Sequence, residues 1–392
     1  MVDDRSDAHP FGEDADAWSA VDWAKVRREL DKLRDFAQGL SLDDVRQGAW
    51  LAGLVRLSLD QYVREVNTGY FAAKYPGVPV EQVVKERIRL AARYASLEGG
   101  ISAGAYTGAV AASVGTGGAA SPLTLPAAGV SFVLDLLFLS HLQLRLAYDI
   151  CVLYRVPLDV QDPEELWKLI RVAFAIKSGE AGRGAIGKGV PVLIRPIIQK
   201  MFSSSGLPVA RSLPLVGRQL LQRNVVKFAI PAVGVPLSMA VNYWSITVSG
   251  NQAVKVFGAE AKIVEAARRM TRDTVHHVEL LWVLWLIVKS DALIHENERL
   301  LLKHVTALVG DLDSELSAIA GLLSTVDVDQ QTVWKMLSAA TGDLDTLYDA
   351  GVVAAAIDGK INVNELTNLR KLADCCSVPY DESAIRAAAQ EY

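Results

Sequence analysis

The chain has 392 residues, a formal net charge of −5 and 51% hydrophobic residues, with a mean hydropathy of +0.22. This length allows two or more domains with cores of their own, and three cysteines, two of them adjacent, exclude a disulfide-stapled secreted scaffold. Residues 1–17 are acidic and lack the apolar core of a signal peptide. They predict a disordered acidic tail on a protein of a reducing compartment.

Helical patterns follow the tail. Apolar residues at helical spacing predict a first helix over residues 22–38. Ser41 and Asp44 have the spacing of a capping box and predict one further helix, whose apolar face continues to Val66. A third helix is expected over residues 80–97. No convincing run of alternating apolar and polar residues indicates a strand, so the chain is predicted to be all-α.

Residues 99–144 are almost uncharged, and Asp135 is their single carboxylate. Gly100, Gly104 and Gly108 recur every four residues, so on a helix they line one face and let another backbone approach closely. The second part predicts an apolar helix around Asp135. A buried carboxylate needs a partner, and we expect one from another helix, supplied by the basic residues after 168.

Arg145 and Asp149 lie on the same predicted helix as Asp135. Arg145 is about 15 Å beyond Asp135 along the helix axis, which is too far for a contact. Asp149 follows Arg145 by four residues, so these two side chains are expected to pair. The next helix has Asp162 as its predicted N-cap, with Glu165 at the position that completes a capping box.

The charge is unevenly distributed along the chain. Residues 168–262 hold 13 Lys/Arg and 2 Asp/Glu, a net charge of +11, whereas residues 1–167 and 263–392 carry −7 and −9. Residues 193–202 have the pattern of a short basic amphipathic helix, which suits an anionic lipid surface or a surface helix packed on the core. We predict that anionic lipid is bound by five basic residues: Arg195, Lys200, Arg218, Arg223 and Lys227.

Residues 228–254 carry no charge at all. The stretch exceeds the roughly 20 apolar residues that span a bilayer. Its prolines, asparagines and glutamine oppose spanning, because their backbone and amide groups would need partners in lipid. A buried helical hairpin, or one that embeds partway, is the expectation.

These central features resemble the EcsC family, which is named from a protein linked to a bacterial ABC-transporter operon. The resemblance covers about residues 80–261. The matching positions are glycines, the apolar helix with its acid and arginine, and a later Pro-Glu-Glu and asparagine: Gly100, Gly104, Gly108, Gly115, Gly117, Gly118, Asp135, Arg145, Pro163, Glu164, Glu165 and Asn242. The family has no agreed biochemical activity, so the resemblance implies a place near membranes and little chemistry.

An internal repeat marks the C-terminal part of the chain. Residues 291–298 and 358–365 share the pattern Asp-x-x-Ile-x-x-x-Glu at an offset of 67, and each copy joins two apolar helices. The copies lack the first ligands of a calcium EF-hand loop. The repeat is similar to that of the TerB-like tellurite-resistance family, over about residues 266–392. That resemblance implies an acidic surface, work at the inner membrane face in stress response, and divalent-metal binding.

By the TerB-like match, the candidate ligands for calcium, magnesium or manganese are four acids: Asp291, Glu298, Asp358 and Glu365. The alternative is that these acids only cap and join helices, because carboxylates are favoured at helix N-termini. Several histidines lie nearby, but their spacing and the absence of neighbouring cysteines do not suit zinc.

The sequence therefore predicts two helical domains, over residues 18–262 and 263–392, in a cytoplasmic bacterial protein attached peripherally to the inner membrane. Its expected partners are an anionic membrane surface and a membrane protein. A hydrolase or another enzyme acting at the membrane is the alternative, although no Gly-x-Ser-x-Gly is present. The glycine-rich residues 179–189 lack the context of a nucleotide loop. A nucleic-acid binder could use the basic segment, but its aromatic residues are too sparse for base stacking, so no nucleic-acid partner is expected.

Overall fold

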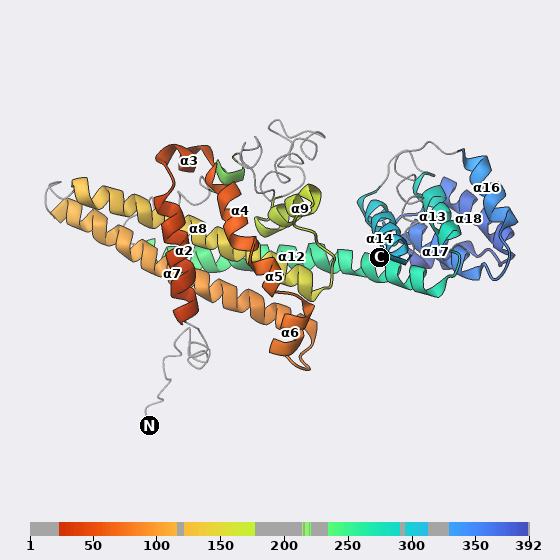
Figure 1. Ribbon diagram of the computed structural model, residues 1–392, viewed down its shortest axis with the longest axis horizontal. Helices are drawn as coiled ribbons and strands as arrows, with labels where there is room; N and C mark the ends of the chain where they lie inside the picture. Colours follow the sequence, from red (N-terminus) through yellow and green to blue (C-terminus); the bar gives the residue numbers. More distant parts are fainter. Residues whose placement is uncertain are drawn as a thin grey trace, which may run out of the picture. The chain divides into compact units, whose positions relative to one another are not determined.

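The computed structural model describes residues 23–115, 121–176, 214, 216–218, 220, 234–290, 295–312 and 329–390. Every regular element in these ranges is a helix, and no strand occurs in them, so the all-α prediction is confirmed (Figure 1). Several predicted features lie outside the described residues. They are the acidic tail, the glycine-rich loop, and the site residues Arg195, Lys200, Arg223, Lys227 and Asp291.

The contacts divide the chain into two compact units. Unit 1 contains residues 1–153 and 157–254, and unit 2 contains residues 154–156 and 255–392. The division falls within the helix α12 (Gly234–Asp273), which is continuous and contributes residues to both units. The sequence placed its domain boundary between residues 262 and 263, eight residues further along the same helix.

The described part of unit 1 begins with five helices: α2 (Trp23–Gln38), α3 (Leu42–Gln47), α4 (Trp50–Leu59), α5 (Tyr62–Glu65) and α6 (Thr68–Lys74). The capping box of Ser41 and Asp44 forms as predicted, but the single helix expected after it is three short helices. Gly48 ends α3 in the left-handed conformation with a φ of 76°. A Cβ at Gly48 would collide with the backbone of Pro214, so glycine is required here and the chain turns.

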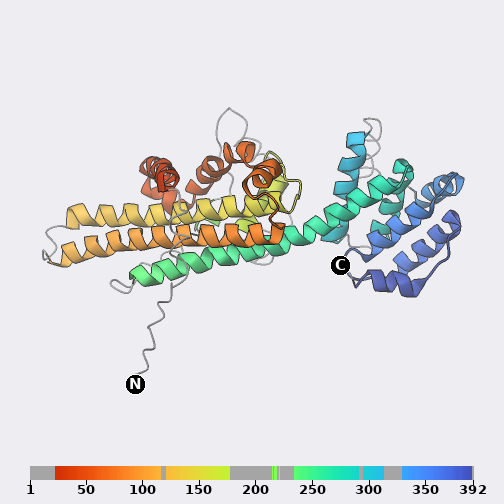
Figure 2. The same ribbon diagram turned by 90° about the horizontal axis from the view of Figure 1, so that it is seen from below.

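Two long antiparallel helices form the centre of unit 1. They are α7 (Val80–Gly115) and α8 (Ser121–Leu153), and they pack against each other along their lengths (Figure 2). The helix predicted over residues 80–97 therefore continues into the glycine-rich stretch as far as Gly115. Helices α2 and α4 pack across α8. Among the described residues, Val133–Leu153 is the one stretch long and apolar enough to cross a membrane, and most of it is buried inside the protein.

Helix α9 (Pro163–Ala173) follows, with Asp162 as its N-cap. The Asp162 side chain accepts from the backbone N–H of Glu164 at 2.9 Å. Glu165 accepts from the backbone N–H of Asp159 at 2.6 Å, which lies outside the predicted capping-box pattern. From residue 234 onward α12 is one continuous helix, so the hairpin expected over residues 228–254 does not form in the described part of that stretch.

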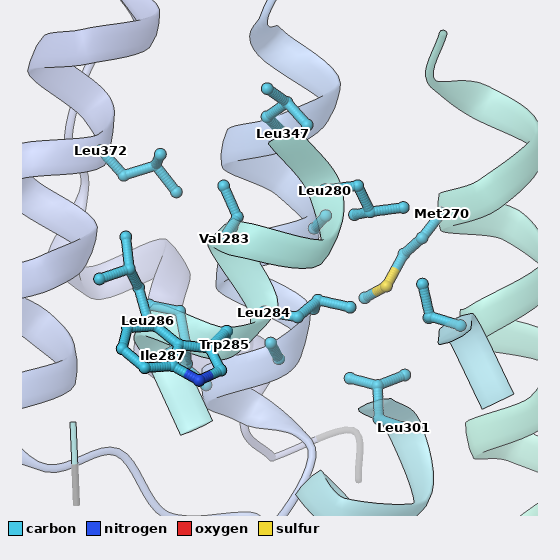
Figure 3. Packing of buried hydrophobic residues seen from close by; sticks show 14 of the residues in the cluster. Met270, Leu280, Val283, Leu284, Trp285, Leu286, Ile287, Leu301, Leu347 and Leu372 are labelled. Carbon is cyan, nitrogen blue, oxygen red and sulfur yellow. The ribbon is translucent and has the colours of Figure 1, made fainter. Parts of the chain in front are cut away.

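Unit 2 is built around α13 (His277–Val288). Around it are α14 (Glu296–Leu312), α16 (Gln330–Ala339), α17 (Asp345–Ala356) and α18 (Val363–Cys376), and α17 also contacts α19 (Glu382–Ala388). Side chains of α13 meet Met270 of α12, Leu301 of α14, Leu347 of α17 and Leu372 of α18 in one apolar core (Figure 3). Burial on all sides explains why α13 is apolar around its whole circumference.

Candidate functional site

A charged network lies where α5, α7 and α8 meet in unit 1. Its centre is the fully buried carboxylate of Asp149 on α8. The Tyr62 hydroxyl donates to Oδ1 of Asp149 at 2.7 Å, and Nε of Arg87 donates to Oδ2 at 2.9 Å. Nη2 of Arg87 donates to the same oxygen. Both oxygens are therefore satisfied, as a buried carboxylate requires.

The surroundings fix the protonation of this part of the network. Burial raises the pKa of the Tyr62 hydroxyl well above its usual value, and the charge of Asp149 raises it further. Burial alone would lower the pKa of Arg87, but the adjacent Asp149 raises it overall. At neutral pH the group is a neutral phenol and a buried ion pair.

Arg145 connects this group to a second one on α2 and α4. Its Nη2 lies 3.3 Å from Oε2 of Glu29, and its Nε donates to the backbone oxygen of Ser58 at 3.1 Å. The guanidinium also stacks 4.4 Å from the ring centre of Tyr62. The predicted pair between Arg145 and Asp149 on one helix face does not form, because each side chain takes a partner from another helix.

Glu29 and His141 complete the second group. Nε2 of His141 lies 3.5 Å from Oε2 of Glu29, and its Nδ1 lies 2.9 Å from the Ser58 hydroxyl. The hydrogen bond from His141, helped by the charge of Arg145, lowers the pKa of Glu29 to about 2. Burial lowers the pKa of His141 to about 4, against the opposing effect of Glu29. Glu29 is therefore an anion and His141 is neutral at physiological pH.

Ser58, His141 and Glu29 have the connectivity of a hydrolase relay, in which a base activates a serine and a carboxylate orients the base. The Ser58 side chain is fully buried, however, and it lines neither of the two cavities beside the network. A nucleophile must reach its substrate, so this arrangement does not support the hydrolase alternative.

The two cavities lie on either side of Glu29, Tyr62 and Arg145, which line both of them. The first, of about 510 Å³, is lined mainly by polar and charged residues of α2, α4 and α5. The second, of about 470 Å³, lies between α6, α7 and α8 and has mainly apolar walls. Both volumes fall in the range of small-molecule sites.

Asp135 lies in a separate buried contact between three helices. Its side chain is fully buried, and its Oδ1 accepts from Nδ2 of Asn242 on α12 at 2.7 Å. The same Nδ2 donates to the backbone oxygen of Ala95 on α7 at 3.1 Å. One partner does come from another helix, and it is a carboxamide. Most of the basic residues after 168, from which we expected a partner, lie outside the described residues, so that prediction stays a prediction. Sequence reasoning did not single out Asn242 as this partner.

Helix α12 buries several polar side chains and exposes two aromatic ones between residues 238 and 251. Its buried face carries Asn242, Ser238 and Ser249 together with the apolar Ile246. Gln143 of α8 donates to the hydroxyl of Ser249 at 2.9 Å. Its outward face carries Trp244, 64% exposed, and Tyr243, 42% exposed, together with the exposed polar Asn251, and the stretch has no charged residue. Buried polar groups opposite exposed aromatic groups are unusual for a water-facing helix.

The repeat in unit 2 uses its glutamates as helix caps. Glu298 accepts from the backbone N–H of His295 at 2.7 Å, and Glu365 accepts from that of Asn362 at 2.7 Å. Both carboxylates are buried at the first turns of α14 and α18. Asp358 accepts from the backbone N–H of Lys360 at 2.7 Å.

These three acids do not assemble a cation site among themselves. No group of three or more His, Cys, Asp or Glu side chains that could hold a metal occurs in the described parts of the chain. The side chain of Asp358 instead lies 3.5 Å from Nε2 of His295. The contacts of the described acids are those of the capping alternative, and the cation ligands remain a prediction from the resemblance.

The two copies of the repeat are joined by hydrogen bonds between their turns. Asn297 donates through Nδ2 to the backbone oxygen of Ile357 at 3.0 Å, and Asn364 donates to that of Ser290 at 3.2 Å. Each donor and each acceptor is separated from its counterpart by 67 residues, the offset of the sequence repeat. The two turns are therefore joined reciprocally, each amide holding the end of the other copy's helix.

Comparisons with protein-family models, with curated proteins and with solved structures gave no match to this chain. The resemblances to the EcsC and TerB-like families therefore rest on the motifs quoted above. Of the predicted lipid-binding residues, Arg218 is described, and it is exposed.

Proposed function

We propose that this is a non-enzymatic bacterial protein that associates with the cytoplasmic surface of the inner membrane through unit 1. The observation that carries the proposal is the outward face of α12. Trp244 and Tyr243 project from an uncharged stretch whose buried face carries Asn242 and two serines. Tryptophan and tyrosine are the residues enriched at the boundary between lipid and water.

Single exposed aromatic residues are common and need no explanation. The same helix has a further feature, because the polar side chains of Asn242 and Ser249 lie on its buried face while the two aromatic residues face outward. Polar side chains directed at helix neighbours are typical of segments whose outer surface contacts lipid. The high burial of Val133–Leu153 favours attachment at the surface over spanning by that helix.

Charge supplies the second part of the proposal. Residues 168–262 carry a net charge of +11, in a chain that is acidic on both sides of them. Each basic group near an anionic leaflet contributes about 1 kcal/mol, weakened by salt. We propose that the lipid-binding residues are Arg195, Lys200, Arg218, Arg223 and Lys227, and that the acidic residues 263–392 contact a membrane-protein partner of a transporter or stress-response system.

The test is flotation with vesicles. The protein should float with vesicles that contain phosphatidylglycerol, less so as ionic strength rises, and little with pure phosphatidylcholine. Trp244→Glu should lower the partition constant at least tenfold, because it places a charge on the contact face. Met336→Glu, on an exposed side chain of unit 2, is the matched control and should leave binding unchanged. Equal flotation of both variants would reject α12 as the contact face.

A further inference from the structure

The cavity of about 470 Å³ in unit 1 has an apolar end and a charged end. Half-buried Leu90 and Tyr94 of α7 and Leu142 of α8 supply accessible apolar walls, and Arg93, which has an interaction partner of its own, also lines the cavity beside Tyr94. Arg87 lies at the other end on the same helix, about 10 Å from Tyr94 along the helix axis. Such a gradient within one cavity suits a molecule with an apolar tail and a polar head.

The sign of the charge at the polar end follows from its ion pairs. All three carboxylates that line the cavity have cationic or histidine neighbours. Asp149 is held by Arg87, and Glu29 lies beside Arg145 and His141. Glu86 lies 3.4 Å from Arg89. Among the described residues that line the cavity, every carboxylate therefore has a neighbour that offsets its repulsion of an incoming anion.

Lys74 is a lining cation that can still bind an anion. It is exposed at the end of α6, lines the cavity, and donates to the hydroxyl of Tyr70 at 3.3 Å. No acid among the described residues lies within ion-pair distance of its Nζ. Arg145 also lines the cavity, and His141 beside it is neutral because burial lowers its pKa. The polar end is therefore complementary to a single negative charge.

We infer that this cavity binds a single-chain anionic amphiphile, a molecule with one alkyl chain and a carboxylate or phosphate head. The chain lies against Leu90, Tyr94 and Leu142, and the head meets Lys74 at the mouth. The inference is independent of the proposed membrane attachment, because it concerns a cavity between α6, α7 and α8 and not the outward face of α12.

Calorimetry with the full chain and monomeric amphiphiles below their micelle concentrations tests the inference. Octanoate, decanoate, laurate and dodecyl phosphate are the probes, and the last two distinguish a carboxylate from a phosphate head. Each added methylene should tighten the Kd about fourfold until the apolar end is filled. Lys74→Glu should weaken laurate binding about tenfold, by removing a charge-assisted hydrogen bond.

The controls make the test decisive. Lys85→Glu makes the same charge change on the exposed side of α7, outside the cavity, and should leave the Kd unchanged. Leu142→Glu should abolish binding, because it places a negative charge in the apolar part of the cavity, with helicity checked by circular dichroism, and Trp244→Glu should have no effect. Equal affinity for dodecyltrimethylammonium or monolaurin, an unchanged Kd in Lys74→Glu, or no heat with any probe would each overturn the inference.

Discussion

Replacing Asp135 by alanine should destabilise unit 1 by about 3 kcal/mol. The carboxylate is fully buried and accepts from Asn242 at 2.7 Å. Losing a hydrogen bond to a charged group costs about 1.5–3 kcal/mol, and a buried donor left short of an acceptor costs about 1–3 kcal/mol more. The sum should fall near its lower end, because Asn242 keeps its bond to the backbone oxygen of Ala95.

Hydrogen exchange measured by mass spectrometry is the suitable assay. Two units need not unfold together, so a single melting temperature would mix their stabilities. In Asp135→Ala, amides of α8 and the first half of α12 should exchange more than 100-fold faster, while those of α13 and α17 stay unchanged. Ser245→Ala removes a neutral bond to Gln143 at 3.1 Å and should cost about 1 kcal/mol or less.

A double variant tests whether Asp135 and Asn242 stabilise unit 1 as a pair. Asp135→Ala with Asn242→Ala should cost clearly less than the two single variants together, because the second change removes a group already deprived of its partner. Additive costs, or unchanged exchange in Asp135→Ala, would refute the reasoning that this contact ties α7, α8 and α12.

Further predictions concern the stability of unit 1 at low pH and the hydrogen bonds of the repeat in unit 2. Unfolded His141 takes up a proton near pH 6.5 and folded His141 only near pH 4, so unit 1 should lose stability as the pH falls through this window. Glu29 ionises near pH 4.5 when unfolded and near pH 2 when folded, so its contribution is lost below pH 4.5. In His141→Gln, the unfolding free energy measured by urea titration should depend less on pH between pH 6.5 and 4. An unchanged pH dependence would contradict the assignment. In unit 2, Asn297→Ala and Asn364→Ala should each cost about 1 kcal/mol of exchange protection at α17 and α13, respectively. Calcium, magnesium or manganese should add no exchange protection in unit 2. Added protection with any of them would favour metal binding by the repeat over helix capping.

Local signals in the sequence predicted local structure well. The pattern of Ser41 and Asp44 forms the expected capping box, and Asp162 caps α9 as predicted. Such contacts involve residues a few positions apart, so spacing determines them. The break at Gly48 was missed, because the close approach of Pro214 that requires glycine comes from a distant part of the chain.

The partners of the charged side chains could not be predicted. Arg145 and Asp149 have the spacing of a helix pair, worth about 0.3–0.5 kcal/mol on an exposed face. Both are partly or fully buried, where partners from α2 and α7 compensate desolvation. Those partners, Glu29 and Arg87, are brought near only by the packing of helices far apart in sequence.

The repeat motif predicted where the two turns lie but not what their acids do. Its offset of 67 residues predicted two equivalent turns, and the first helical residues of α14 and α18 lie at that offset. The identity of the acids suggested ligands as readily as caps, since both need a carboxylate near a helix start. The backbone contacts of Glu298 and Glu365 distinguish the two uses, and these depend on the path of the chain.

Quenching of tryptophan fluorescence by brominated lipid tests the membrane claim most directly, because it reports contact between Trp244 and acyl chains. The spectrum of Trp244→Phe subtracted from that of the native protein isolates one of eight tryptophans. With phosphatidylglycerol vesicles, we predict that the Trp244 emission shifts to shorter wavelength and is quenched by the brominated lipid. If the protein binds the vesicles but the Trp244 emission is neither shifted nor quenched, α12 does not face the membrane. The proposed attachment through α12 would then be wrong.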